Sequence, residues 1–450
     1  MERLDLSQEL AREVLDKAKA KGATQGDVVM VEGDSFFVTV RLGEVEKISQ
    51  AQEKRLGLRL FYGNSSASAS TSDISRQAID RHVEDTINMA RFTAQDPFSG
   101  LPDASLLARD IPDMDLFDEA GSVSVDDKIA IALAAEKAAM EFDPRITNSE
   151  GAEFSNQSGR VIYASTHGFC GEYYGSNFGH SVAPVASQNG SMQRDYWYSS
   201  NRKFARLDSA ESVGKRAAQR VLRRLGARKI KTCEVPIVFD PDMAASLLRN
   251  LASALSGYSL YKGASFLNGQ LGNKIASDLT TVWDDGTIPE ALGSKPFDSE
   301  GLPITKKAVV ENGFLRSYLL DTYSGKKLNM VSTGNASRSV GEPPGVAPTN
   351  FFLAPGKQSP DAIIGSVKQG LYLTETIGFG VNLVTGDYSR GAAGIWIENG
   401  ELAYPVEEVT IAGNLKEMFH NIEMIGNDLE LRGRIAAPTI KISKMTVAGE

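Results

Sequence analysis

Apolar residues recur along this chain at two spacings, one typical of strands and one typical of helices. Alternating apolar positions predict strands over residues 27–31, 35–40 and 55–62. Residues 64–72 are rich in Ser and Ala and fit either a strand of small residues or a loop. Apolar positions at helical spacing predict a helix over residues 75–91. The first part of the chain therefore contains strands that are followed by a helix.

The same order of strands and helix recurs further along the chain. An Ala-rich helix is predicted over residues 126–141 and ends before Pro144, and another helix is predicted over residues 208–225. The strands predicted between these two helices cover residues 161–164, 169–176 and 192–199. This repetition makes an internal duplication of a strand-and-helix unit plausible.

The chain is too long for one ordinary domain, since it has 450 residues. Residues 96–125 contain three prolines and several Asp, which is typical of a linker. We therefore predict one α/β module over residues 1–95 and a second over residues 126–232. Residues 233–450 carry a helix that begins at Asp240 and then mostly strands and turns, which predicts a β-rich C-terminal domain.

Charge and composition exclude several classes of protein. The formal net charge of -9 argues against general binding to nucleic-acid phosphates, which requires clustered Lys and Arg. The first residues predict an amphipathic helix that stops at Gly22, without the apolar stretch of a signal peptide. No apolar run is long enough to span a membrane, and two cysteines cannot form a disulfide framework. We expect an acidic, soluble, cytoplasmic protein without a membrane contact.

One predicted helix is strongly basic and raises the question of nucleic-acid binding. Its positive residues are Lys215, Arg216, Arg220, Arg223, Arg224 and Arg228. The opposite face of this helix is apolar, and no aromatic residues that could stack on bases accompany the basic ones. We interpret the basic residues as the solvated face of an amphipathic helix, and we do not expect nucleic-acid binding.

Metal ligation is the next chemistry to consider. A catalytic zinc ion needs about three converging imidazole, thiolate or carboxylate ligands, often two of them from one helix. The chain has four histidines, His82, His167, His180 and His420, and no two of them have helical ligand spacing. A scattered site formed by His167, His180, Cys170 and a carboxylate is conceivable. The residues favour ordinary hydrogen-bonded or surface histidines instead.

Residues 378–428 form the most informative stretch of the chain. They are dense in Gly, Asn and Asp between short apolar runs, a pattern typical of strands joined by tight turns. Three segments stand out: VTGDYSRGAAGIWIENGE at residues 384–401, YPVEEVTIAGNL at 404–415 and IGND at 425–428. With these segments the stretch resembles the corresponding region of the TldD/PmbA family, also called modulators of DNA gyrase. Two further matching segments are FDSEG at residues 297–301 and LLDTYSGKKL at 319–328.

The resemblance spans nearly the whole chain and is strongest to the PmbA branch, also called TldE. It implies an α+β fold, with two related N-terminal α/β modules followed by a larger β-rich C-terminal domain. It also implies a cytosolic heterodimer with a zinc-bearing TldD-type subunit, a pair that acts as a peptidase on short or unfolded peptides. In such a pair this chain carries no cofactor of its own. It would close the substrate chamber and offer sheet edges to an extended peptide.

The zinc motif of the TldD-type members is degenerate in this chain. Those members carry His-Glu-x-x-x-His shortly before a segment whose counterpart here is GASFLNGQLG at residues 263–272. Counting back puts Leu248 and Ser253 at the two His positions and Arg249 at the Glu position. The Cys that completes the site should follow the IGND segment, but residues 429–438 contain none. Arg249 would repel a divalent cation and cannot act as a base.

A glycine-rich turn provides the candidates for a substrate chamber or a subunit interface. These candidates are Asn382, Thr385, Asp387, Tyr388, Ser389, Arg390 and Trp396. Glycines in such a turn allow a peptide backbone to approach closely, although a demanding β-turn alone would also account for them. We also expect Phe379, Trp396 and Tyr404 to be aromatic anchors of a contact between the C-terminal domain and its partner.

Two other functions remain open from the residues. The chain could be an independent homodimeric metallopeptidase with an unrecognised metal site. It could also be a regulatory module that binds DNA gyrase or another large target. Metal content and peptide hydrolysis of the purified chain distinguish the first alternative from a heterodimer subunit. Binding to the target in the absence of any TldD-type protein distinguishes the second.

Overall fold

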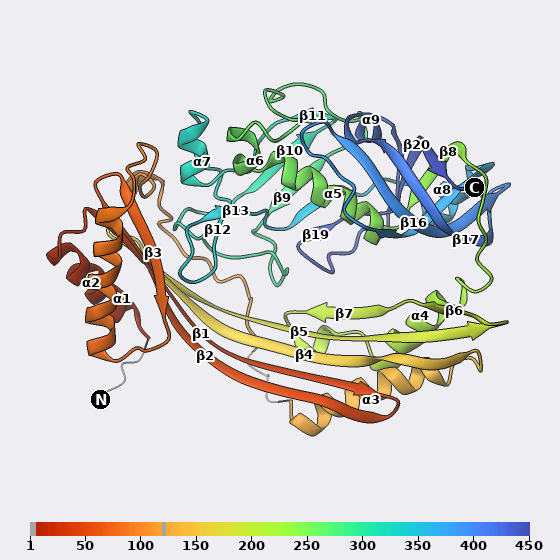
Figure 1. Ribbon diagram of the computed structural model, residues 1–450, viewed down its shortest axis with the longest axis horizontal. Helices are drawn as coiled ribbons and strands as arrows, with labels where there is room; N and C mark the ends of the chain where they lie inside the picture. The colour runs from red at the N-terminus through yellow and green to blue at the C-terminus, as the bar shows by residue number, and fades with distance from the viewer. Residues whose placement is uncertain (1–5, 119–122) are drawn as a thin grey trace.

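The computed structural model describes residues 6–118 and 123–450. Residues 1–5 of the predicted N-terminal helical segment and residues 119–122 of the predicted linker lie outside the described residues. Figure 1 shows a long curved sheet with its helices and, above it, a C-terminal domain of shorter strands. The helices and strands confirm the predicted α+β class. Within the described ranges, no helix has both the length and the apolar character needed to span a membrane.

A single antiparallel sheet joins the two predicted N-terminal modules. Its strands are β1 (Gln25–Arg41), β2 (Glu44–Tyr62), β3 (Ser65–Thr71), β4 (Ile146–Ser165), β5 (Cys170–Gln188), β6 (Ser191–Arg194) and β7 (Trp197–Asn201). They lie in the order β3-β2-β1-β4-β5-β6, and β7 pairs with β5. Strand β1 of the first module pairs with β4 of the second over residues 27–40. The modules are thus related in layout but share one sheet.

The predicted break between residues 31 and 35 was wrong. Strand β1 continues through residues 32–34, because these residues pair with β2 on one side and with β4 on the other. The Ser/Ala-rich segment, for which strand and loop were both open, is strand β3 and pairs with β2. Within residues 96–125 the described part contains one short 3-10 turn (Ala104–Leu106) and the start of a helix at Val125.

Four helices cover one face of this sheet. They are α1 (Gln8–Ala20), α2 (Arg76–Phe92), α3 (Val125–Met140) and α4 (Ala210–Leu222). Each begins after a serine whose side chain accepts a hydrogen bond from a backbone N–H of the first turn. Val28 and Met30 of β1 pack in a cluster with α1 and α2, whereas Val38 and Val40 pack in a cluster with α3 and α4. The opposite face of β1 is free of these helices.

The C-terminal domain contains a closed barrel. Its strands are β8 (Cys233–Phe239), β15 (Gln369–Ile377), β16 (Asp387–Glu398), β17 (Glu401–Asn414) and β20 (Ile440–Ala448), with β18 (Ile422–Ile425) beside β20. The order β17-β16-β15-β8-β20 closes because residues 410–412 of β17 pair with residues 446–448 of β20. Only the contact between β15 and β8 is parallel among the described pairings of this barrel. The β-rich character expected from the sequence is therefore that of a barrel with an added sheet.

A second, five-stranded sheet completes the domain. It consists of β9 (Val282–Asp285), β10 (Lys306–Glu311), β11 (Phe314–Leu315), β14 (Phe351–Leu353) and β19 (Ile435–Ala436). The remaining elements are the ribbon β12 (Ala336–Ser337) and β13 (Gly345–Val346), and the helices α5 (Pro241–Leu255), α6 (Gly257–Tyr261), α7 (Thr322–Lys327), α8 (Pro360–Gly365) and α9 (Leu415–His420). Helix α5 contacts β8 and β15 of the barrel as well as β14 and β19 of the second sheet.

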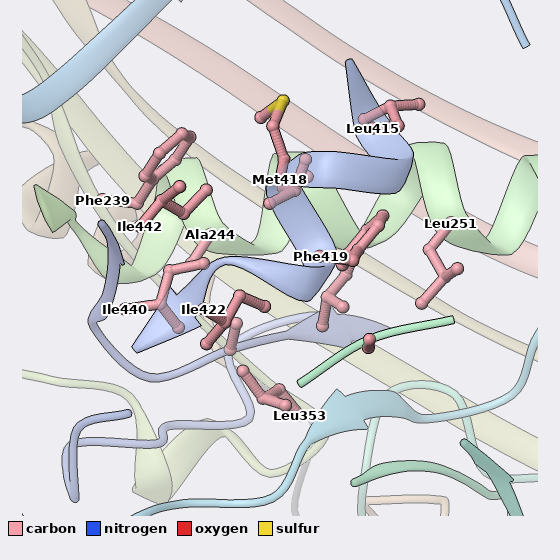
Figure 2. Packing of buried hydrophobic residues seen from close by; sticks show 14 of the residues in the cluster. Phe239, Ala244, Leu251, Leu353, Leu415, Met418, Phe419, Ile422, Ile440 and Ile442 are labelled. Atoms are coloured by element: carbon pink, nitrogen blue, oxygen red, sulfur yellow. The ribbon is translucent and has the colours of Figure 1, made fainter. Parts of the chain in front are cut away.

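The main hydrophobic core of the C-terminal domain surrounds helix α5. Ala244 and Leu251 of α5 belong to the same buried cluster as Met418 and Phe419 of α9. Figure 2 shows these side chains together with Phe239 and other core residues at the ends of the neighbouring strands. Because the core holds α5 on several sides, the position of its exposed face is fixed.

The C-terminal domain packs on the helix-free face of the N-terminal sheet. Phe297 lies in a buried cluster with Val29 and Tyr163, which project from β1 and β4. The guanidinium group of Arg202 donates hydrogen bonds to the main-chain oxygens of Ala291 and other residues of the C-terminal domain, the first at 3.2 Å. Apolar and polar contacts therefore hold the two bodies against each other.

A row of glycines crosses the middle of this face. Gly33 of β1 lies opposite Gly159 of β4, which in turn lies opposite Gly175 of β5. A methyl group on Gly159 would lie 2.7 Å from the main-chain oxygen of Glu32, closer than side chains tolerate. A cavity of about 550 Å³ lies over this row, and residues of the C-terminal domain, including Arg338, line its other side.

Candidate functional site: an arginine-rich cavity between the two domains

Helix α5 carries Leu248, Arg249 and Ser253, the three positions at which the resemblance to TldD-type members led us to expect a degenerate zinc motif. The side chain of Asp240 begins the helix by accepting a hydrogen bond from the N–H of Met243 at 2.9 Å. Leu248 is buried in the core, whereas Arg249 and Ser253 are exposed. The three degenerate positions therefore do not point to one common site.

A cavity of about 640 Å³ lies beside α5, between the N-terminal sheet and the C-terminal domain. Its size falls within the range of about 300–1,000 Å³ that is typical of ligand pockets. We call it the arginine cavity, after the six arginines that line it: Arg216, Arg220, Arg223, Arg249, Arg432 and Arg434. Its wall includes α5 and the segment that follows Asp428. The structure thus brings the degenerate zinc window next to the segment in which the third ligand was sought.

The six arginines outnumber the carboxylates of the same cavity. The lining carboxylates are Asp240, Asp242, Asp428 and Glu430. Arg220 donates from Nε to Oδ1 of Asp195 at 3.2 Å, and Arg432 forms an ion pair with Glu430. A surplus of positive charge remains in the cavity of a chain whose net charge is -9.

Trp197 stands between two of these guanidinium groups. The guanidinium carbon of Arg216 lies 3.9 Å from the centre of the Trp197 ring, and that of Arg432 lies 4.3 Å from it. The indole is 4% exposed. Such cation–π contacts are attractive when the groups are shielded from water, so Trp197 links α4 to the segment after Asp428.

Four arginines of the cavity have no carboxylate partner in the described structure, and one of them, Arg216, contacts the Trp197 ring instead. Within residues 6–118 and 123–450, Arg223, Arg249 and Arg434 form no ion pair. The Nε and Nη2 atoms of Arg223 are buried and have no hydrogen-bond partner among the described residues. Burial lowers the pKa of Arg223, because a charged group in a partly dry site loses hydration. A guanidinium nevertheless stays charged at neutral pH.

Asp240 has an unusual environment at the base of α5. It is buried, and burial raises its pKa to about 7, with the neighbouring Asp242 acting in the same direction. The N–H of Met243 and the charge of Arg220 oppose the shift. Asp240 therefore titrates near neutral pH, unlike an ordinary aspartate.

The basic helix was predicted to present a solvated face, and this prediction was wrong for part of its residues. Arg220, Arg223 and Arg224 are half-buried against the C-terminal domain. Arg224 pairs with Glu375 of β15, and Arg220 lies 4.0 Å from Asp240. Periodicity identified the polar face of α4 correctly, but it could not show that another domain covers that face.

The residues present do not fit a zinc ion. Nowhere in the described part of the chain do three His, Cys, Asp or Glu side chains converge as a metal site would require. His167 contacts the main-chain oxygen of Pro102 at 2.7 Å, and His180 that of Asp208 at 2.8 Å, so each ring is bound separately. At the degenerate window a guanidinium group stands where the general base is expected. No step of a zinc mechanism can be derived from this chain.

The glycine-rich turn is braced by its own side chains. Thr385 donates from Oγ1 to Oδ2 of Asp387 at 2.6 Å, which lowers the pKa of Asp387. Asn382 accepts from the N–H of Val384 at 2.9 Å, and Asn414 donates to Asp387 at 3.1 Å. Asn382, Thr385, Asp387 and Ser389 are exposed. The turn therefore has an internal structural explanation, while a role in a chamber or interface stays a prediction.

The larger members of this group lie deeper in the structure. Tyr388 and Trp396 are 2% and 7% exposed and belong to the core of the C-terminal domain. Arg390 is half-buried and reaches α5, where Nη1 donates to Oγ of Ser246 at 3.3 Å. In the described structure none of the seven candidates lines the arginine cavity. A surface role could fall only to the exposed residues and to Arg390.

Sequence reasoning missed the residues that define the cavity. Arg432 and Arg434 follow the IGND segment, where only the missing Cys was sought. Trp197 lies at the end of a predicted strand and carried no motif. The Asp-Pro-Asp sequence at residues 240–242 did indicate the start of a helix, but not the burial of its first carboxylate.

Comparison with known proteins identifies the family. Three family models match the chain: PmbA/TldA metallopeptidase domain 1 at residues 26–90, the central domain at 118–225 and the C-terminal domain at 232–449. The chain belongs to the PmbA/TldA metallopeptidase family. It is 38% identical over 449 residues to the metalloprotease PmbA of Escherichia coli O157:H7, which covers 98% of each chain. The predicted family membership is confirmed.

Solved structures of family members share the fold. A candidate modulator of DNA gyrase from Bacteroides thetaiotaomicron superposes with a TM-score of 0.92 at 28% identity, covering 99% of this chain and 100% of that one. TldE from Thermococcus kodakarensis superposes with a TM-score of 0.89 at 22% identity, covering 98% and 100%. The arrangement of the curved sheet and the C-terminal domain is therefore common to these proteins.

Proposed function

We propose that this chain is the PmbA/TldE-like subunit of a cytosolic TldD/TldE-type metallopeptidase that processes or degrades short or unfolded peptides. In this proposal the chain does not hold the catalytic zinc ion. A zinc-bearing TldD-type subunit supplies the metal, and this chain completes the chamber in which the peptide lies. Family membership supports the peptidase context.

The observation that carries the proposal is the chemistry of the degenerate window. Leu248 is buried, Arg249 lines a cavity with five other arginines, and Ser253 is exposed. Zinc requires neutral imidazoles, thiolates or carboxylates held together, and a surplus of guanidinium groups opposes a divalent cation. A subunit with this site needs a partner for zinc-dependent hydrolysis.

Affinity purification of the full chain from its source cells tests the partnership. We expect a protein with the His-Glu-x-x-x-His motif to co-purify in a defined ratio. Recovery of DNA gyrase or another large target, without any protein that carries this motif, would favour the regulatory module. A stable homodimer that hydrolyses peptides alone would favour the independent enzyme.

Reconstitution tests the division of roles. The isolated chain should hydrolyse an unfolded peptide no faster than buffer, and activity should follow addition of the TldD-type subunit and vanish with a chelator. A TldD-type subunit whose motif Glu is replaced by Gln serves as the control, because it should assemble without restoring hydrolysis. Chelator-sensitive cleavage by the isolated chain, with one tightly held zinc per monomer, would contradict the proposal.

A further inference from the structure

The arginine cavity holds positive charge that the protein itself does not neutralise. Three of its six arginines have local partners or stacking contacts: Arg220 with Asp195, Arg432 with Glu430, and Arg216 with Trp197. Arg223, Arg249 and Arg434 have no ion pair within the described ranges. The first group already has partners within its own domain, and the second is available to a ligand.

The free atoms of Arg223 have the geometry of a carboxylate receptor. Its Nε and Nη2 atoms are buried and lack a hydrogen-bond partner among residues 6–118 and 123–450. These two nitrogens form one edge of the guanidinium plane, the edge that donates two parallel hydrogen bonds to a carboxylate. A buried donor without a partner is unfavourable, so a carboxylate that enters as the Arg223 side chain turns toward the cavity would gain two hydrogen bonds.

The cavity is accessible from solvent and is not uniformly basic. Arg249 and Arg434 are exposed at its rim, whereas Arg223 is half-buried. The carboxylates of Asp240, Asp242 and others also line the wall, which leaves a surplus of two arginines over four acidic side chains. A small surplus suits a singly charged carboxylate better than a doubly charged phosphate, which the acidic residues would repel more strongly.

We propose that the arginine cavity is a receptor for peptide carboxylates, with Arg223 as the bidentate donor and Arg249 and Arg434 at the entrance. This inference rests on the proposed peptidase function for its choice of a peptide as the ligand. The carboxylate comes from the free C-terminus of the peptide or from an Asp or Glu side chain. The cavity beside helix α5 would thus bind an anion and hold one end of the peptide.

Binding of short unstructured peptides to the isolated full chain tests the proposal without a partner subunit. Four peptides of one sequence are compared by titration calorimetry: one with a free C-terminus and an internal Glu, its C-terminal amide, its Glu-to-Gln form, and the doubly neutral form. We expect the doubly neutral peptide to bind about ten-fold or more weakly than the first. If the C-terminal amide alone binds more weakly, the cavity binds the C-terminal carboxylate. If the Gln form alone binds more weakly, the cavity binds the Glu side chain.

Variants of the chain identify the receptor. The double variant Arg223→Gln, Arg249→Gln should bind the charged peptide about ten-fold or more weakly and should no longer distinguish it from the neutral one. Arg434→Gln removes an exposed side chain, so it tests the entrance even if the double variant folds poorly. Arg81→Gln removes an exposed arginine from α2, outside the cavity, and should bind like the unmodified chain.

Trp197 provides an optical readout from the same cavity. Because two cavity arginines stack on its ring, a bound carboxylate should change its fluorescence. Trp197→Phe should lose this signal. Equal affinity for the charged and neutral peptides, affinity unaffected by all three arginine substitutions, or no binding of any peptide would overturn the proposal.

The two proposals can fail separately. If peptide binding depends on a carboxylate but no zinc subunit co-purifies, the carboxylate receptor is supported and the heterodimeric peptidase is contradicted. If a zinc subunit co-purifies and restores hydrolysis but peptide affinity does not depend on charge, the proposed function is supported and the carboxylate receptor is contradicted.

Discussion

Arg338 donates a hydrogen bond from Nη1 to Oδ1 of Asp27 at 2.7 Å, although the two residues are 311 positions apart. Both side chains are buried, at 4% and 0% exposure. Arg59 of β2 binds the other oxygen of Asp27, and Glu300 lies 3.5 Å from Arg59. A buried network of charges therefore joins the first strand of the N-terminal sheet to the C-terminal domain.

Removing Arg338 should destabilise the contact between the two bodies. Burial alone would raise the pKa of Asp27, but Arg338 and Arg59 hold it below its ordinary value. Arg338→Met leaves Asp27 with one cation instead of two, and loss of one partner from a buried pair is strongly destabilising. We expect a loss of about 2–4 kcal/mol in the free energy of unfolding, measured with urea.

The control for this variant is an exposed ion pair. Arg145 binds Asp143 at the surface, and Arg145→Met should leave the unfolding midpoint nearly unchanged. If Arg338→Met is as stable as Arg145→Met, the buried network does not hold the two bodies together. Unfolding monitored by probes in both bodies would also show whether they separate before they unfold.

Asp240 should make the stability of the chain fall as pH rises toward neutrality. Its pKa is raised to about 7 in the folded state by burial, against an ordinary value of 3.8. Between these values the folded state keeps a proton that the unfolded state has lost, so the stabilising contribution is full below pH 3.8 and disappears near pH 7. Asp240→Asn should flatten this dependence and raise stability at pH 8 by roughly 1–3 kcal/mol.

Urea unfolding at pH 5 and pH 8 measures this effect. Asn can replace Asp as a helix-capping residue, so the substitution changes the charge and keeps the cap. Asp126→Asn alters a carboxylate in the exposed first turn of α3 and serves as the comparison. The same slope with pH in the unmodified chain and in Asp240→Asn would contradict the assignment.

The glycine row should tolerate no side chain at its centre. A Cβ on Gly159 would lie 2.7 Å from a main-chain oxygen of β1, which cannot move without shifting the strand. Gly159→Val should therefore destabilise the chain by about 1–3 kcal/mol. Gly365→Ala provides the control, because apart from its chain neighbours and its own helix backbone no described atom lies within 4 Å of the new methyl group, and its unfolding midpoint should hardly change.

Local sequence patterns predicted much of the fold correctly. The helix at residue 75 was recognised from its serine cap and apolar spacing, and Ser75 does accept the hydrogen bond from the N–H of Ala78. Alternation over residues 55–62 identified the apolar end of β2. Its remainder, from Glu44 onward, is exposed and carries no apolar alternation, so its pairing with β1 could not be foreseen.

The sequence could not predict which elements pack against each other, and the reason is physical. Periodicity reports which residues of an element share a face, but not what covers that face. Arg220 therefore resembled a surface residue, although the C-terminal domain packs on it in the structure. Tyr388 lies in a turn-rich segment typical of a surface, yet its ring is in the core. The degenerate zinc window stays a prediction, because it rests on residue identity and a resemblance.

Restoring the motif residues on α5 should not restore a metal site. The triple variant Leu248→His, Arg249→Glu, Ser253→His supplies two imidazoles and a carboxylate, but position 248 is buried in the core. The cavity would keep its other arginines, and the segment after Asp428 would still lack a Cys. Metal analysis after dialysis should find no stoichiometric zinc, and one zinc per monomer in this variant would show that the arginines do not oppose the metal.

The partner should bind the C-terminal domain, and Phe379 is the residue to test. Of the three predicted anchors, Trp396 is buried at 7% exposure, and the ring of Tyr404 lies 4.6 Å from the guanidinium carbon of Arg228. Phe379 is fully exposed at 103%. An exposed aromatic ring is a typical anchor of a stable subunit contact, which should bury upwards of about 1,000 Å².

Phe379→Asp should therefore abolish association with the TldD-type subunit, measured by size-exclusion chromatography with light scattering, and leave the isolated chain folded. Phe92→Asp is the matched control, because Phe92 is 92% exposed at the end of α2 on the N-terminal sheet. Both substitutions place the same charge on the surface, so a difference between them reports the position of the contact. Loss of association in Phe92→Asp, with Phe379→Asp unaffected, would move the interface to the N-terminal sheet.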